Sequence, residues 1–353
     1  MNNIDTNQKN RWICTTPNEI SVFKKTMLAV SAMALLALFL LYFFSGVFQF
    51  LYTGLIISIG NNREEAGRIA DILITEELMI LAKNVASICI SIFSFVLSSL
   101  FFMFIMNGKP KGIDSHISLK PKLPKNSIVL IIVGLSIVHF FAYISAVFDI
   151  TLGFFGIQKY VGAFHSFPQT TAGIIVYFFS VVITPALFEE FVFRYLMLNA
   201  LRKYGNAFAI VVSSVLFGFI HASTNAFFFA TALGLFSAYI AIKTKSIWFS
   251  VILHAVVNGV AMTMEYLGGT LSDYSFSIVN FVYLDFILAV SVISMIIFIK
   301  KNKKIELAEH KNYVHIKKRT KLLSFGNVIS ILFFVIVILI SMTDYYFQFG
   351  EFS

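Results

Sequence analysis

The sequence predicts an all-α protein, a polytopic membrane bundle of about eight or nine transmembrane helices. Of the 353 residues, 58% are hydrophobic and 13% are charged, which is about half of the charged share of a typical soluble domain. The apolar residues also gather into runs, and a helix needs about 20 such residues to cross the roughly 30 Å of hydrocarbon in a bilayer. This composition argues strongly against an ordinary water-soluble enzyme.

Nine apolar runs are candidates for spanning helices. In chain order they are 27–57, 78–107, 127–149, 172–199, 207–222, 226–242, 247–264, 277–299 and 325–343. The first run is too long for the hydrophobic region of a cleaved signal peptide, and no small-residue cleavage site follows it. Because 207–222 and 226–242 are short, the count falls to eight if one short run is re-entrant.

The net charge of the connecting segments alternates in sign along the chain. The positive ones are 1–26 (+2), 108–126 (+4), 200–206 (+2), 243–246 (+2) and 300–324 (+7). The negative ones are 58–77 (−3), 265–276 (−2) and 344–353 (−2). By the positive-inside rule, nine spans then place the N-terminus in the cytoplasm and the C-terminus outside. We read the basic loop 300–324 as an orientation determinant rather than as a nucleic-acid site, although binding of anionic lipid is an alternative.

Ionisable residues occur inside three of the apolar runs, where a charge is costly and points to function by default. The stretches are PALFEEFVFR with Glu189, Glu190 and Arg194, SVLFGFIHA with Phe217 and His221, and SVILHAVVN with His254 and Asn258. Each holds a pair four residues apart, which shares one helix face. Together they can aim two carboxylates, two imidazoles and an amide inward, a set suited to deprotonating a water and stabilising an oxyanion.

Proline and glycine residues in these spans predict how the polar faces meet. Pro185 lacks an N–H and clashes with the carbonyl of Val181, so we expect a kink just before the carboxylates. Gly218, Gly234 and Gly259 allow close helix approach. Because the runs 207–222 and 226–242 are short, we expect the turn between them to dip into the bilayer.

A buried polar network that only holds helices together is the main alternative to a catalytic site. We favour that reading for a single intramembrane histidine such as His139. For the acidic pairs Glu64–Glu65 and Glu76–Glu77 we expect a solvated surface. Packing alone does not explain so many titratable groups on three successive spans.

The stretches EEFVFR, FGFIH and HAVVN resemble the EExxxR, FxxxH and HxxxN motifs of the CPBP family, the CAAX proteases and bacteriocin-processing enzymes also called Abi. The family includes the Ras-converting CAAX endopeptidases. The resemblance covers roughly 172–265 and departs from the family at Tyr195, where many members have a small residue. It implies an intramembrane endopeptidase on a helical bundle.

The resemblance also implies a role for each motif residue. Glu189 would activate the attacking water and His221 would hold it. His254 and Asn258 would stabilise the oxyanion, and Glu190 and Arg194 would orient the site. Phe217 is expected to contact substrate. Zinc held by Glu189, His221 and His254 is an alternative, but no H-E-x-x-H spacing supports it, so we lean toward a site without a tightly bound metal.

The sequence therefore predicts an endopeptidase acting on a membrane-associated peptide or protein in a bacterial plasma membrane. Peptide maturation, signalling or bacteriocin self-immunity are favoured, with the bilayer as a partner and no nucleic acid. A catalytically silent scaffold and a secondary transporter are the alternatives, the latter weakened by the absence of duplicated halves. The expected regions are 1–126 with two extra spans, the protease core 127–299, and 300–353 with the basic loop and last span.

Overall fold

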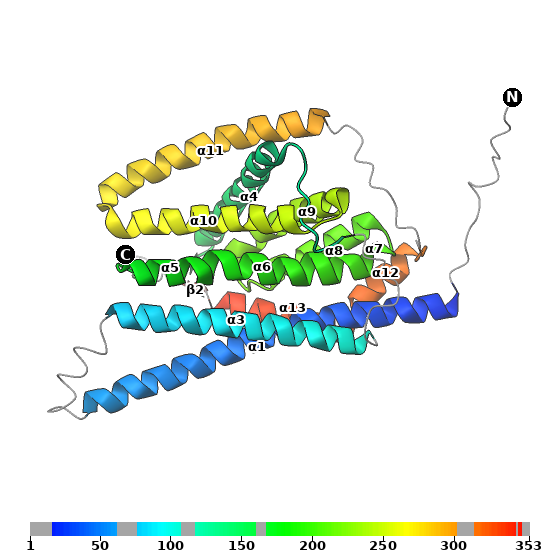
Figure 1. Cartoon of the computed structure of the whole chain (residues 1–353), viewed down its shortest axis with the longest axis horizontal. Coiled ribbons are helices and arrows are strands. Elements are labelled where there is room, and N and C mark those ends of the chain that lie inside the picture. The colour runs from blue at the N-terminus through cyan, green and yellow to red at the C-terminus, as the bar shows by residue number, and fades with distance from the viewer. Residues whose placement is uncertain are drawn as a thin grey trace.

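The computed structural model describes residues 16–61, 76–106, 117–159, 167–301, 314–343 and 345–347. Within this part the protein is a stack of long helices that run roughly along one direction (Figure 1). The pair Glu64–Glu65 and residues 302–313 of the basic loop lie outside the described residues. The all-α prediction is confirmed.

The helices follow the apolar runs closely. They are α1 (Pro17–Asn61), α3 (Glu76–Ile105), α4 (Ser127–Phe154), α5 (Thr171–Phe178), α6 (Thr184–Glu190), α7 (Asn199–Arg202), α8 (Asn206–Phe219), α9 (Thr224–Thr244), α10 (Trp248–Thr270), α11 (Asp273–Lys301), α12 (Lys318–Phe325) and α13 (Val328–Met342). Two three-residue strands, β1 (Ile157–Lys159) and β2 (Tyr345–Phe347), pair antiparallel.

Six helices in the described residues are long and apolar enough to cross a membrane, or seven if the bent pair α12 and α13 counts as one span. The count of eight or nine is therefore not confirmed. The run 207–222 yields α8, which has 14 residues, about 21 Å of helix and too short for the hydrocarbon layer.

One span carries both carboxylates and is distorted on either side of them. The segment Thr171–Arg202 remains a single span of 32 residues. Two π-helical segments, η2 (Phe179–Ile183) and η3 (Phe191–Leu198), flank α6. The segment η2 ends two residues before Pro185, where the sequence predicts a kink, and π-helical turns of this kind are frequent at functional sites.

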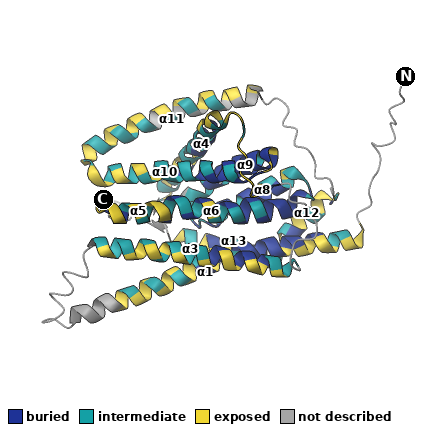
Figure 2. Ribbon diagram, viewed as in Figure 1, coloured by how far each residue is buried: buried dark blue, intermediate teal, exposed yellow. Residues whose placement is uncertain are grey.

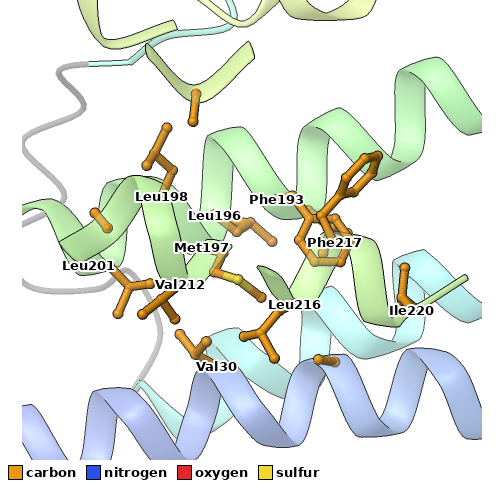
Figure 3. Close-up of a cluster of buried hydrophobic side chains, with 14 of the residues drawn as sticks. Val30, Phe193, Leu196, Met197, Leu198, Leu201, Val212, Leu216, Phe217 and Ile220 are labelled. Atoms are coloured by element: carbon orange, nitrogen blue, oxygen red, sulfur yellow. The ribbon is translucent and has the colours of Figure 1, made fainter. Parts of the chain in front are cut away.

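Buried residues concentrate in α8, α9, the middle of the span Thr171–Arg202 and the first half of α1 (Figure 2). Val30 of α1 points toward Met197 and Leu216 in this core (Figure 3). Outer helices such as α11 expose much of their apolar surface, as expected for helices that face lipid.

Two of the three predicted close-approach glycines lie at tight helix contacts. A Cβ on Gly218 would lie 2.1 Å from Thr231 Oγ1, and one on Gly234 would lie 2.9 Å from the Ser214 Cβ. Gly259 has nothing within 4 Å of its Cβ position, so the expectation of close approach there was wrong. The small residues thus bring α8 against α9 and do not draw in α10.

The basic segments in the described residues meet at one end of the bundle (Figure 1). Ser118 N donates to the Lys245 carbonyl at 3.0 Å, and Val314 N donates to the Lys203 carbonyl at 2.7 Å. These two bonds join, in two pairs, four segments that the charge pattern assigned to the same side. Which side faces the cytoplasm stays a prediction.

Candidate active site

Three of the predicted residues form a fully buried ionic cluster between α6, η3 and α10. Arg194 Nε lies 3.0 Å from Glu190 Oε2 and Nη2 donates to Oε1 at 3.3 Å. His254 Nδ1 lies 3.2 Å from the same Oε1. Since a carboxylate only accepts, Nδ1 must carry the proton, which leaves His254 Nε2 as the atom directed to other partners.

Phe217 of α8 is the packing centre of this cluster. Its ring contacts His221 and His254 edge-on, with ring centroids 5.1 and 5.7 Å away. The Arg194 guanidinium carbon lies 4.7 Å from its centroid, within the range of a cation–π contact. Phe217 is fully buried, so the structure gives it a supporting position, and its expected contact with substrate stays a prediction.

His221 lies just past the end of α8, in the turn that leads to α9. Its Nδ1 faces the Phe217 carbonyl at 2.8 Å and therefore carries the proton, which leaves Nε2 as an acceptor. The next residue, Ala222, is buried with a φ of 46°, a left-handed conformation that costs a residue with a Cβ roughly 1 kcal/mol or more. Such strain is common next to functional side chains.

Glu189 is half-buried, and its Oε2 is buried without a hydrogen-bond partner in the described residues. Its charge acts on Arg194 together with that of Glu190. The two neighbouring glutamates thus differ in their ion pairs, because Glu190 lies against Arg194 and His254 while Glu189 Oε2 has no hydrogen-bond partner in the described residues.

Asn258 does not meet the imidazoles through any described hydrogen bond. Its Nδ2 donates to the Val181 carbonyl at 2.9 Å, the carbonyl that would normally bond the residue four positions on, where Pro185 has no N–H. The amide therefore ties α10 to η2. One of its two N–H groups is used in this way.

Three polar contacts lie away from this cluster, and the sequence predicted them only in part. His139 bonds the Leu135 carbonyl and the Tyr283 hydroxyl, which fits the helix-holding role expected for it. Tyr177 donates to Glu265 between α5 and α10. No pattern in the sequence pairs these two residues, since they lie 88 positions apart.

Glu77 is not merely solvated, which corrects the expectation for that residue. It accepts hydrogen bonds from Gln169 N at 2.9 Å, from Thr170 N at 2.8 Å and from the Thr170 hydroxyl. Its carboxylate thereby lies at the N-terminus of α5, where negative charge is favourable.

Metal binding by the candidate zinc ligands stays a prediction. The described residues contain no group of three or more His, Cys, Asp or Glu side chains placed to hold a metal ion. Glu189, His221 and His254, the candidate zinc ligands, do not form such a group in this conformation, so no chemical step is routed through zinc below.

Comparison with known proteins finds similarity in the segment that carries the three sequence motifs. Residues 171–260 match the sequence profile of the family described as Type II CAAX prenyl endopeptidase Rce1-like. A Bacillus subtilis (strain 168) protein named "Putative membrane peptidase YdiL" is 34% identical over 87 residues, 24% of this chain and 35% of that protein. The match thus spans about a third of the curated relative. No solved structure matches the chain.

All three motifs fall inside the matched segment, whereas α1, α3, α4, α11 and α13 lie outside it. Together with the apolar helices, the match identifies an integral, multi-pass membrane protein.

Proposed function

We propose, from the premise that residues 171–260 are a segment of the CPBP family, that the protein is an intramembrane endopeptidase. In this proposal it hydrolyses a peptide bond in a membrane-associated peptide or protein. The observation that supports the proposal most is the contrast between the two adjacent carboxylates. Glu190 forms buried ion pairs with Arg194 and His254, whereas Glu189 is half-buried and its Oε2 has no hydrogen-bond partner in the described residues.

In the proposed reaction, Glu189 is the general base. It takes a proton from a water whose oxygen attacks the substrate carbonyl carbon, and the acceptor nitrogen Nε2 of His221 holds that water. The carbonyl electron pair moves to its oxygen to give a tetrahedral oxyanion. When the intermediate collapses, the C–N bond breaks and the proton on Glu189 passes to the leaving amine. General base catalysis of this kind contributes about 10²–10⁴-fold.

The oxyanion needs donors that are already in position, because a fixed donor in a water-poor site is worth more than one in bulk water. We assign this to Asn258, through its second N–H, and to His254. The Nδ1 proton of His254 is held by Glu190, which directs Nε2 toward the other side of the ring.

Glu190 and Arg194 are positioning residues in this proposal. The guanidinium holds Glu190 from two nitrogens, and Glu190 in turn orients His254. The cation–π contact of Arg194 with Phe217 links the same cluster to the turn that carries His221. We propose that the substrate lies in a bacterial plasma membrane and is matured by cleavage or neutralised for self-immunity.

The test uses purified protein in detergent micelles with a fluorogenic peptide library. Wild type and Glu189→Gln are compared with Asp273→Asn, which removes an exposed carboxylate in the first turn of α11. We expect cleavage by wild type and by the Asp273→Asn control, and a loss of at least about 100-fold in Glu189→Gln. Equal cleavage by all three would refute the role of Glu189.

Parallel reactions with a chelator and with added zinc test the metal alternative. Turnover that survives the chelator supports the water-and-glutamate reaction. Turnover that is lost with the chelator and restored by zinc would assign Glu189, His221 and His254 as ligands instead. Absence of cleavage by every folded variant, across library and membrane-tethered peptides, would favour the silent scaffold.

A further inference from the structure

One arginine outside the candidate active site lies where α7 turns into α8. The turn is tight because Gly205 has a φ of 118°, a backbone conformation that glycine adopts without strain. The Gly205 N–H donates to the Arg202 carbonyl at 3.0 Å. Arg202 Nε donates to Oδ1 of Asn206, the first residue of α8, at 3.0 Å. The turn therefore holds the Arg202 guanidinium against the first turn of α8.

The Arg202 guanidinium is buried and incompletely paired. The residue is 4% exposed, and its Nη1 is buried without a hydrogen-bond partner in the part of the chain that the structure describes. The ion pairs found in that part involve Arg194 and His254 with Glu190, and they do not include Arg202. A guanidinium keeps its charge at any physiological pH, and a buried charge without a partner is strongly destabilising. This nitrogen therefore favours an added anion.

The first turn of α8 presents backbone donors beside this guanidinium. The N-cap of α8 is Gly205, which has no side chain to accept from these groups. The N–H groups of Ala207 and Phe208 have no backbone acceptor among the described residues. The start of a helix carries roughly +0.5 of an elementary charge, and its unpaired N–H groups bind anions readily. Side-chain and backbone donors thus lie at the same turn.

Two lysines add positive charge around this turn. Lys321 of α12 donates to the Tyr204 carbonyl, and its Nζ lies 5.0 Å from the centroid of the Phe208 ring. Lys203 Nζ lies 4.9 Å from the centroid of the Tyr204 ring, and burial lowers the pKa of Lys203. Helices α7, α8 and α12 lie at the same end of the bundle (Figure 1). Because both lysines already have contacts within the chain, they contribute charge here rather than the hydrogen bonds that would hold a ligand.

We propose that the turn between α7 and α8 binds a phosphate group, held by Arg202 Nη1 and by the N–H groups of Ala207 and Phe208. Guanidinium groups and helix N-termini both bind phosphate, and a tetrahedral phosphate has enough oxygens for the two sets of donors. A soluble phosphate and a lipid headgroup share this chemistry. The site does not depend on proteolysis, so it stands or falls separately from the proposed function.

The first test measures binding of radiolabelled orthophosphate to the full chain in detergent, by equilibrium dialysis at constant ionic strength. Wild type is compared with Arg202→Gln and with Lys122→Gln, which makes the same charge change at an exposed loop residue. We expect saturable binding by wild type and by Lys122→Gln. Arg202→Gln should bind roughly tenfold or more weakly, the loss expected for one charge-assisted hydrogen bond.

A second variant, Arg202→Lys, guards against misfolding of Arg202→Gln. It keeps the positive charge but loses the planar fork of the guanidinium, so it should weaken phosphate binding by a smaller factor. A second arm distinguishes the two sources of phosphate. Native mass spectrometry counts the phosphatidic acid molecules retained by wild type and by Arg202→Gln. Greater retention by wild type assigns the site to a lipid headgroup, whereas orthophosphate binding with equal retention assigns it to a soluble phosphate.

The proposal is overturned if wild type shows no saturable binding of orthophosphate and retains no more phosphatidic acid than Arg202→Gln. Orthophosphate binding that is as strong in Arg202→Gln and Arg202→Lys as in wild type would also overturn it, because the phosphate would then lie elsewhere. An equal loss in Lys122→Gln and Arg202→Gln would do the same, since binding would then follow the overall positive charge of this end rather than one site.

Discussion

Replacing Gly218 by alanine should displace the turn that carries His221. The added Cβ would lie 2.1 Å from Thr231 Oγ1 and 2.9 Å from the Phe227 carbonyl oxygen. The second contact is with backbone, which yields only if α8 and α9 separate. Overpacking of this kind costs about 1–3 kcal/mol, which outweighs the roughly 0.5–1 kcal/mol that alanine gains over glycine in a helix.

Gly259→Ala is the matched control, because nothing lies within 4 Å of its Cβ position. This variant should gain about 0.5–1 kcal/mol from helix propensity alone. The two substitutions are chemically identical, so their difference isolates the packing contact between α8 and α9. Thermal unfolding in detergent, followed by circular dichroism, should show a lower Tm for Gly218→Ala and an equal or higher one for Gly259→Ala.

A double-mutant cycle makes the reasoning sharper. Thr231→Ala removes the 2.1 Å contact and should recover part of the stability lost in Gly218→Ala, which appears as a positive coupling between neighbours. If Gly218→Ala unfolds at the same temperature as Gly259→Ala, the close approach of α8 and α9 does not support the His221 turn.

Three further substitutions test the polar contacts. Arg194→Gln should lower the free energy of unfolding by about 3–5 kcal/mol, because it leaves the buried Glu190 charge without its partner; an unchanged Tm would contradict this. Asn258→Ala should cost about 1–3 kcal/mol by leaving the Val181 carbonyl unpaired, measured in the same assay, and a neutral result would remove the link between α10 and η2. Glu77→Gln removes a charged cap on α5 that is worth about 0.5–2 kcal/mol, and it should therefore lower the Tm. A Tm difference from wild type that does not change with salt would contradict this role of the charge.

The span pattern and the motif residues could be predicted from the sequence because both are local signals. Apolar runs mark helices by length, and the i,i+4 spacing of Glu190 and Arg194 fixes their pairing on one helix face. The structure bears this pairing out at 3.0 Å. The structure also places His221 in the turn beyond α8, which ends at Phe219, and so outside the helix of the run 207–222.

Contacts between distant segments could not be predicted in the same way. The bond from Asn258 to the Val181 carbonyl depends on a π-helical segment, and hydrophobic periodicity carries no signal for such a turn. Gly259 resembles Gly218 in sequence context, yet only the packing of neighbouring helices decides which of them is crowded. The capping of α5 by Glu77 likewise joins residues more than 90 positions apart.

In this account Glu189 is the general base, whereas Glu190 is a positioning residue. The most direct test of this difference measures kcat and Tm together for Glu189→Gln and Glu190→Gln. Glu189 has a free, half-buried carboxylate, so its variant should keep the wild-type Tm and lose kcat by about 10²–10⁴-fold. Glu190 is buried against Arg194 and His254, so its variant should lose Tm as well. A Glu189→Gln protein that cleaves as fast as wild type, or a Glu190→Gln protein with unchanged Tm, would contradict the account.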